Sequence, residues 1–132
     1  MKLVIGGYSQ GKLNYVLQEK GAENCLVLDA ELPDTEQIKE AASRGKTIVI
    51  DHFHLWVREH LLQGKDPENE VEDFLRRAPE IIVISDEIGG GIVPAGAFER
   101  EYRERTGRML VRLAKEADEV VRVLCGIGQR IR

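Results

Sequence analysis

The stretch Lys2-Leu3-Val4-Ile5-Gly6-Gly7-Tyr8-Ser9-Gln10-Gly11-Lys12-Leu13 decides the expected fold, because an apolar strand runs directly into a glycine-rich loop. The loop has the spacing GxxxxGK, in which backbone N–H groups and the N-terminus of the following helix surround an anionic phosphate. The lysine would reach the terminal phosphates of a bound nucleotide. The sequence therefore predicts a nucleotide-binding site formed by Gly6, Gly7, Tyr8, Ser9, Gln10, Gly11, Lys12 and Leu13.

The residue after the lysine departs from the complete motif. A Ser or Thr hydroxyl at this position binds the Mg²⁺ ion that bridges the phosphates, whereas Leu13 offers no oxygen. The sequence therefore supports phosphate binding better than metal-assisted transfer. The alternative is an ordinary glycine-rich turn with a solvated Lys12. A dinucleotide-binding loop is disfavoured, because Tyr8 stands where its second glycine would be.

The composition predicts one domain over residues 1–132, with 42% hydrophobic and 32% charged residues. The 19 Lys and Arg alternate with the 23 Asp and Glu, so no nucleic acid is expected as a partner. The sequence contains no long apolar run and no signal peptide, which predicts a cytoplasmic protein without membrane contact. Cys25 and Cys125 lie in apolar runs and are expected to be small buried residues, not disulfide or zinc ligands.

Apolar runs alternate with amphipathic segments, which is typical of an α/β protein. The continuous hydrophobicity of the runs predicts a mainly parallel sheet of about five strands covered on both faces. Together with the phosphate loop, this predicts a P-loop nucleotide-binding three-layer fold. Strands are expected at residues 3–5, 25–28, 47–50, 81–84 and 120–124. Helices are expected from Leu13, after Asp34 as N-cap, over 53–62, over 68–77 with Pro67 in the first turn, and over about 97–117. Residues 126–132 are interpreted as a short tail.

Asp51 follows the third apolar run, at the C-terminal end of a predicted parallel strand, where open α/β sheets bind ligands. Its carboxylate is expected to hold the phosphate-bound Mg²⁺, directly or through water, and so to compensate partly for Leu13. The alternative is a helix N-cap. His52, His54 and His60 are interpreted as polar residues around the mouth of the site, because they lack the ligand spacing of a metal centre.

The segment Ser85-Asp86-Glu87-Ile88-Gly89-Gly90-Gly91-Ile92-Val93-Pro94 leaves the fourth predicted strand with two carboxylates and three glycines. Acidic side chains at the exit of a strand can orient a nucleophile, and glycines let a loop approach a ligand closely. Glu87 is a candidate for orienting a substrate hydroxyl. A solvent-exposed loop with an acidic rim is the alternative.

Four stretches taken together resemble the bifunctional adenosylcobinamide kinase / adenosylcobinamide-phosphate guanylyltransferase family of cobalamin biosynthesis. They are GGYSQGK at 6–12, DHFHLW at 51–56, SDEIGGGIVP at 85–94 and ADEVVRVLCGI at 117–127. The resemblance implies GTP or ATP binding with Mg²⁺, phosphorylation of a cobinamide-type small molecule and transfer of GMP through a guanylylated histidine. It also implies a homo-oligomer, typically a trimer.

The chain departs from this family at two places. Leu13 replaces the family's serine, and the shortened interval from Asp29 to Lys46 lacks the family's histidine. Kinase-type phosphoryl transfer, with Lys12, Asp51 and Glu87 as catalytic residues, is therefore more compatible with the chain than guanylyl transfer. The alternatives are a non-catalytic nucleotide-binding or regulatory homologue and a structural subunit that packs through the helix at 97–117, so enzymatic activity stays an open question.

Overall fold

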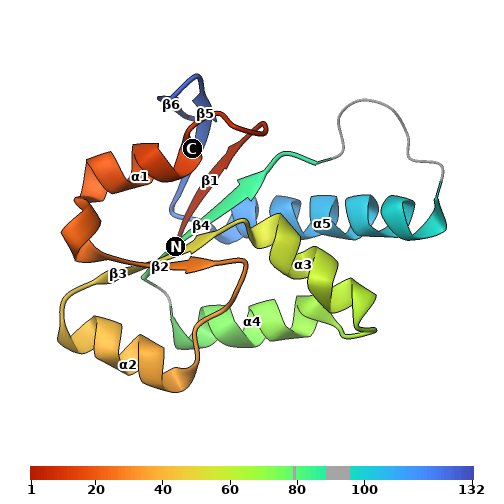
Figure 1. The fold of residues 1–132 in the computed structure, drawn as a ribbon, viewed down its shortest axis with the longest axis horizontal. Coiled ribbons are helices and arrows are strands. Elements are labelled where there is room, and N and C mark those ends of the chain that lie inside the picture. The colour runs from red at the N-terminus through yellow and green to blue at the C-terminus, as the bar shows by residue number, and fades with distance from the viewer. Residues whose placement is uncertain (79, 89–95) are drawn as a thin grey trace.

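The computed structural model describes residues 1–78, 80–88 and 96–132 (Figure 1). Its middle layer is a six-stranded sheet with the order β2-β3-β4-β1-β5-β6. Neighbouring strands are parallel except for β5 and β6, which are antiparallel. The strands are β1 (Lys2–Gly6), β2 (Cys25–Asp29), β3 (Thr47–Asp51), β4 (Ile81–Asp86), β5 (Glu119–Leu124) and β6 (Ile127–Arg130). The predicted α/β class and mainly parallel sheet are confirmed.

Within the described residues, five α-helices and one 3₁₀ turn connect the strands. They are α1 (Lys12–Lys20), η1 (Ala22–Asn24), α2 (Thr35–Ser43), α3 (Phe53–Leu62), α4 (Pro67–Arg77) and α5 (Ala97–Glu116). The predicted N-cap Asp34 is confirmed, because its carboxylate accepts the backbone N–H of Gln37 while the Gln37 side chain accepts the N–H of Asp34. Pro67 occupies the first turn of α4, where a missing N–H costs nothing.

The helices cover the two faces of the sheet unequally. Alternate residues of each strand point to opposite faces, so Leu3 and Val4 belong to different cores. Val16 of α1 packs with Val4 on one face, whereas α2, α3, α4 and α5 share the larger core on the other. Figure 1 shows α1 on one side of the strands and α2 and α4 on the other. Phe53 and Phe74 are fully buried in the larger core, and each contributes about 2 kcal/mol by burial.

The C-terminal end differs from the sequence prediction. Residues 126–132 are not a tail throughout, because β6 pairs with β5 in a hairpin over four positions. The ring of Tyr15 packs directly onto the backbone of Gly128, so a side chain at position 128 would have to displace this ring. Cys25 is buried as expected, but Cys125 lies in the turn of this hairpin and is exposed, which corrects the expectation of two buried thiols.

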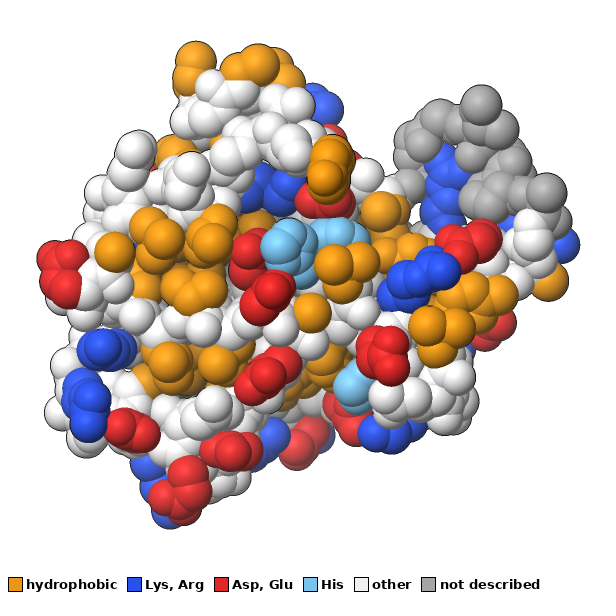
Figure 2. Space-filling model, in the orientation of Figure 1, with side chains coloured by type: hydrophobic (Ala, Val, Ile, Leu, Met, Phe, Trp, Pro, Cys, Tyr) orange, Lys and Arg blue, Asp and Glu red, His pale blue; other side chains and the backbone are white. Residues whose placement is uncertain are grey.

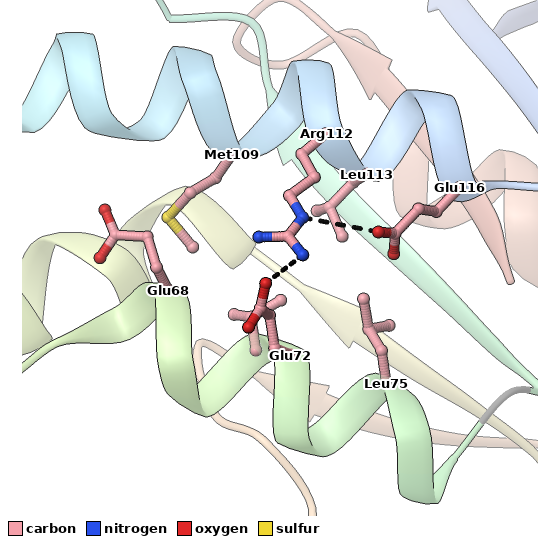
Figure 3. Close-up of a pocket in the computed structure, with 8 residues that line it drawn as sticks. Glu68, Glu72, Leu75, Met109, Arg112, Leu113 and Glu116 are labelled. Atoms are coloured by element: carbon pink, nitrogen blue, oxygen red, sulfur yellow. Dashed lines mark hydrogen bonds and ion pairs between the residues drawn. The ribbon is translucent and has the colours of Figure 1, made fainter.

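A small pocket separates α4 from α5 (Figure 3). Met109, Leu113 and Leu75 line it, and the Arg112 guanidinium lies between the carboxylates of Glu72 and Glu116. Its volume of about 30 Å³ is enough for one water molecule but far too small for a nucleotide. The pocket is therefore a feature of helix packing, and the functional site lies elsewhere.

In the part of the chain that the structure describes, no helix has both the length and the apolar character needed to span a membrane.

Candidate functional site

An open pocket of about 310 Å³ lies at the C-terminal ends of β1, β3 and β4, where a parallel sheet presents its loops. It is bounded on one side by the predicted phosphate loop and on the other by residues that end β3 and β4. The lining residues are Tyr8, Ser9, Gln10, Gly11, Lys12, Leu13, Asn14, Asp51, His52 and Asp86. Figure 2 shows histidine and carboxylate side chains gathered near the centre of the face in view.

The loop between β1 and α1 has the backbone that its glycines predict. Gly11 has φ 82°, in the left-handed region that glycine adopts without strain, and immediately precedes α1. A Cβ on Gly6 would stand 2.6 Å from the carbonyl oxygen of Val123, so only glycine lets β1 and β5 approach this closely. Tyr8 projects from the loop and is largely exposed.

Lys12 does not extend into solvent. Its side chain is 8% exposed, and the Nζ ammonium donates to the carbonyl of Gly7 at 2.7 Å. It also lies 2.7 Å from Oδ1 of Asp86. Lys12 is therefore not the solvated side chain that the alternative of an ordinary turn expects, because its ammonium is bonded to the loop and to Asp86.

Asp86, at the end of β4, joins the lysine to α3. Its backbone N–H donates to Nδ1 of the buried His54 at 3.1 Å, and its Oδ2 lies 3.3 Å from Nε2 of the same ring. Nδ1 can accept this bond only without a proton, so a neutral ring carries its proton on Nε2, which faces Oδ2 of Asp86. Burial lowers the pKa of His54 below its ordinary value, which agrees with a neutral ring. His54 thus positions the carboxylate that faces Lys12.

Asp51 lies at the end of β3, as predicted, and its carboxylate borders the pocket. Its Oδ1 accepts the backbone N–H of His52 at 2.9 Å. The His52 ring contacts two carboxylates through Nδ1, at 2.6 Å from Asp29 Oδ1 and 3.4 Å from Asp51 Oδ2. The hydrogen bond to Asp29 raises the pKa of His52 above its ordinary value, against a smaller lowering by burial.

Glu87 is not brought to the pocket. Its carboxylate lies 3.2 Å from the guanidinium of Arg122 on β5, and its backbone N–H donates to the carbonyl of Gly6 at 2.8 Å. Glu87 therefore ties β4 to β1 and pairs with a neighbouring strand, and it is absent from the lining of the pocket. Residues 89–94, the glycine-rich part of the same predicted loop, lie outside the described residues.

The turn of the β5–β6 hairpin supports the phosphate loop. The backbone N–H of Cys125 donates to the side-chain oxygen of Gln10 at 2.7 Å, and the N–H of Gly126 donates to the main-chain oxygen of Gln10 at 2.8 Å. A Cβ on Gly11 would stand 3.4 Å from the Cα of Gly126. The C-terminal hairpin therefore lies directly against the loop and fixes its position.

The sequence prediction names Asp86 only as one of the two carboxylates of residues 85–94, and His54 only as a polar residue around the mouth of the site, without joining the two. The expected end of the fourth strand at Ile84 was two residues early, because β4 runs to Asp86. With the correct end, the rule that placed Asp51 at the site would have selected Asp86 in preference to Glu87. Asp29 ends β2 in the same way and carries the same signal.

The donors around Asp51 fit a divalent cation. Two carboxylates and an imidazole nitrogen, from Asp29, Asp51 and His52, lie within 4.8 Å of one another, and these are ordinary ligands of such ions. Leu13 lines the pocket but brings no oxygen to it. The carboxylate side of the pocket therefore suits a metal ion, while the first turn of α1 does not contribute the usual hydroxyl.

Comparison with known proteins identifies one family of cobalamin biosynthesis to which the chain is similar. A family model described as cobinamide kinase / cobinamide phosphate guanyltransferase matches residues 18–131, which leaves the phosphate loop just outside the match.

Curated relatives match over shorter stretches. The bifunctional adenosylcobalamin biosynthesis protein CobU of Salmonella typhimurium is 41% identical over 58 residues, which cover 43% of this chain and 32% of the relative. The protein of the same name from Escherichia coli is 38% identical over 58 residues, with the same coverage of 43% and 32%. The bifunctional adenosylcobalamin biosynthesis protein CobP of Pseudomonas aeruginosa is 28% identical over 111 residues, 80% of this chain and 64% of the relative.

The matched stretches thus span between about a third and two thirds of the relatives' own length. The family model, in contrast, covers most of this chain, from the last turn of α1 to just past the end of β6. The chain belongs to the cobinamide kinase / cobinamide phosphate guanyltransferase family.

Proposed function

We propose that this chain binds a nucleoside triphosphate, GTP or ATP, in the pocket at the phosphate loop and uses it for kinase-type phosphoryl transfer to a cobinamide-type acceptor. The observation that carries the proposal is the buried Lys12 ammonium, which is bonded to the glycine-rich loop and to Asp86 and lines one pocket with Asp51. Phosphate oxygens are the natural ligands of a cation and a glycine-rich loop in this arrangement.

Each residue has a role that its position supports. The loop from Gly6 to Gly11 would hold the phosphates, and Lys12 would neutralise charge that develops on them during transfer. A Mg²⁺ ion bound with the nucleotide supplies charge neutralisation at the transferred phosphate, and Asp51 would hold it. Glu87 is a weaker candidate for orienting the acceptor hydroxyl, because its carboxylate pairs with Arg122 outside the pocket lining.

Guanylyl transfer is less well supported than phosphoryl transfer. Asp29 to Lys46, where the resemblance expects the guanylylated histidine, contains no histidine. His52 borders the pocket, but it follows the next strand and its Nδ1 contacts two carboxylates. The chain therefore contains the phosphate loop that phosphoryl transfer needs, but it lacks the histidine that guanylyl transfer needs in the family.

Isothermal titration with GTP and ATP, with and without Mg²⁺, tests the nucleotide site. Lys12→Ala should weaken binding by about tenfold to a hundredfold, because a hydrogen bond to a charged group contributes roughly 1.5 to 3 kcal/mol. Lys39→Ala, on the exposed side of α2, is the matched control and should bind as the wild type does. Equal affinity of the wild type and Lys12→Ala would show that this loop does not grip the phosphates.

A non-catalytic nucleotide-binding or regulatory role is the second candidate, favoured by Leu13. Leu13→Ser restores the missing oxygen and separates the two. Phosphorylation of adenosylcobinamide by either form supports a kinase, whereas tight nucleotide binding with no product from either form supports the binding role. A purely structural subunit would show no thermal shift with any nucleotide.

The remaining expectations stay predictions. A homo-oligomer, typically a trimer by the family resemblance, is testable by light scattering on the purified chain. The single domain over residues 1–132 and the cytoplasmic location likewise stay predictions.

A further inference from the structure

Two adjacent strand ends place three ligand-type side chains together. Asp29 ends β2 and Asp51 ends β3, and the two residues are direct partners in the parallel register. His52 follows Asp51 in the chain. One donor atom from each side chain lies within 4.8 Å of the other two.

The backbone holds this arrangement in place. Ala30 and His52, the residues after the two aspartates, both have φ 53°. The N–H of Ala30 donates to the carbonyl of Asp51 at 2.8 Å, which extends the ladder between β2 and β3 past the aspartates. After the aspartates, the backbone leaves β2 and β3 with the same conformation. The two carboxylates therefore remain next to each other, and the His52 imidazole contacts both.

The distances suit a shared cation. Donor atoms bound to one divalent ion at about 2.1 Å lie roughly 3 to 4.2 Å apart. Nδ1 of His52 lies 3.4 Å from Asp51 Oδ2, already in this range, and 2.6 Å from Asp29 Oδ1, which would need to open by a few tenths of an ångström. The proton that Nδ1 shares with Asp29 would pass to solvent as the ion takes its place. Asp29 is exposed on the β2 edge of the site and is free to make this adjustment.

We propose that Asp29, Asp51 and His52 form a built-in divalent metal site that binds a borderline ion of the Mn²⁺ type in the absence of nucleotide. The donor set is mixed, and an imidazole nitrogen favours transition ions over Mg²⁺, which prefers oxygen and keeps its waters. Asp51 and His52 line the same pocket as Lys12, so the ion lies at the rim of the phosphate site.

This inference deepens the proposed function, on which its catalytic meaning rests, because it names the ion and its protein ligands. A complete phosphate loop offers a hydroxyl to the nucleotide-bound metal, and Leu13 does not. Asp29 and His52 add two donors beside Asp51. The chain thus gains at the ends of β2 and β3 the coordination that it lacks at the start of α1.

Electron paramagnetic resonance of free Mn²⁺ tests the site without nucleotide and without turnover. The wild-type chain should remove one equivalent of Mn²⁺ from solution in a saturable way. Asp29→Asn and His52→Ala should each weaken this binding at least tenfold. The matched controls are His60→Gln, whose ring pairs with Glu70, and Asp73→Asn, whose carboxylate pairs with Arg77, and both should leave Mn²⁺ binding unchanged.

Three results would overturn the proposal. They are no saturable binding by the wild type, equal affinity in Asp29→Asn or His52→Ala, and displacement of Mn²⁺ by an equal concentration of Mg²⁺. Circular dichroism of each variant guards against misfolding, and Asp29→Asn, an isosteric change at an exposed side chain, keeps the test available if His52→Ala folds poorly.

The test is separable from that of the nucleotide site. Lys12→Ala should lose triphosphate affinity measured in EDTA but keep Mn²⁺ affinity measured without nucleotide. Mn²⁺ binding without triphosphate binding would leave the metal site standing and refute the proposed function. The reverse result would leave the nucleotide site standing and refute the metal site.

Discussion

Asp86 divides its carboxylate between two partners, Lys12 through Oδ1 and His54 through Oδ2. The same Lys12 ammonium is the group that would bind a terminal phosphate. A carboxylate 2.7 Å from this cation competes with phosphate for it and repels the incoming negative charge. Asp86 is therefore expected to hold Lys12 in place at a cost in nucleotide affinity.

The substitution Asp86→Asn tests this competition. The amide keeps the shape and an oxygen acceptor but removes the charge, so the affinity for GTP or ATP should rise by about tenfold, equivalent to roughly 1.4 kcal/mol. Isothermal titration measures the change, with Asp73→Asn as the control that should leave affinity unaltered. Unchanged or weaker binding in Asp86→Asn would mean that the carboxylate does not compete with the nucleotide.

At this scale the sequence predicted the residues that belong to a motif and missed those defined by a neighbouring strand. Lys12 and Asp51, which line the pocket, were predictable because motif spacing and strand ends can be recognised in a local stretch of sequence. The sequence proposes Glu87, but β4 runs to Asp86, and the next side chain, Glu87, pairs with Arg122 on β5 and not with the pocket. The contact of His52 with Asp29 depends on the pairing of β2 with β3, which no local pattern contains.

Ion pairs link α4 to α5. The Arg105 guanidinium donates to both carboxylate oxygens of Glu68, at 2.9 and 2.6 Å, and also to Glu101 at 3.0 Å. The hydrogen bonds from Arg105 lower the pKa of Glu68 to about 2, well below its ordinary value of 4.5. A bidentate pair of this kind is geometrically specific even near the surface.

The pKa of Glu68 predicts a pH dependence of stability. Its ionised form is favoured by folding, so its contribution is complete above about pH 4.5 and is lost as the pH falls towards 2. Because the pair is partly screened by solvent, Glu68→Gln should lower the free energy of unfolding by about 1 kcal/mol at pH 6. The difference from the wild type should shrink steadily in urea titrations at pH 5, 4 and 3.

Glu104→Gln provides the comparison for that series. Glu104 pairs with Arg108 one helical turn away, and both side chains are exposed. A pair of this kind contributes only a few tenths of a kcal/mol. A pH-independent difference between Glu68→Gln and the wild type would contradict the bidentate pair as the source of the stabilisation.

Among the elements, helices and buried strands were predictable, and the hairpin was not. The start of α2 and the span of α3 follow from a capping residue and an apolar stripe, both of which are local signals. β6 has four residues, most of them exposed, and follows a turn that contains Gly126. Its identity as a strand depends on the adjacent edge of β5, so its sequence alone resembles a tail.

The local stability of the strands is expected to fall from the centre of the sheet to its β6 edge. β1 and β4 are paired on both sides and buried on both faces, whereas β6 pairs only with β5. Hydrogen exchange should therefore be slowest in β1 and β4, which open only with global unfolding. The amides of β6 should exchange faster through local opening.

Native-state hydrogen exchange by NMR, read residue by residue at low denaturant, checks this order. Exchange of β6 at the rate of β4 would show that the hairpin unfolds only with the whole sheet. Addition of GTP should slow exchange at Cys125 and Gly126 if the nucleotide site is as proposed, because their amides are bonded to Gln10 of the loop. Comparison of the two experiments separates the stability of the hairpin from the effect of the ligand.

The turn that touches the phosphate loop also carries an exposed thiol, while burial raises the pKa of the other thiol, Cys25, and makes it slow to react. A maleimide dye would thus attach at Cys125 alone, without any engineered substitution. Because the amide of Cys125 is bonded to Gln10, the dye would stand at the mouth of the pocket and its emission would follow occupancy in real time. The natural sequence therefore already contains the attachment point for a fluorescent sensor.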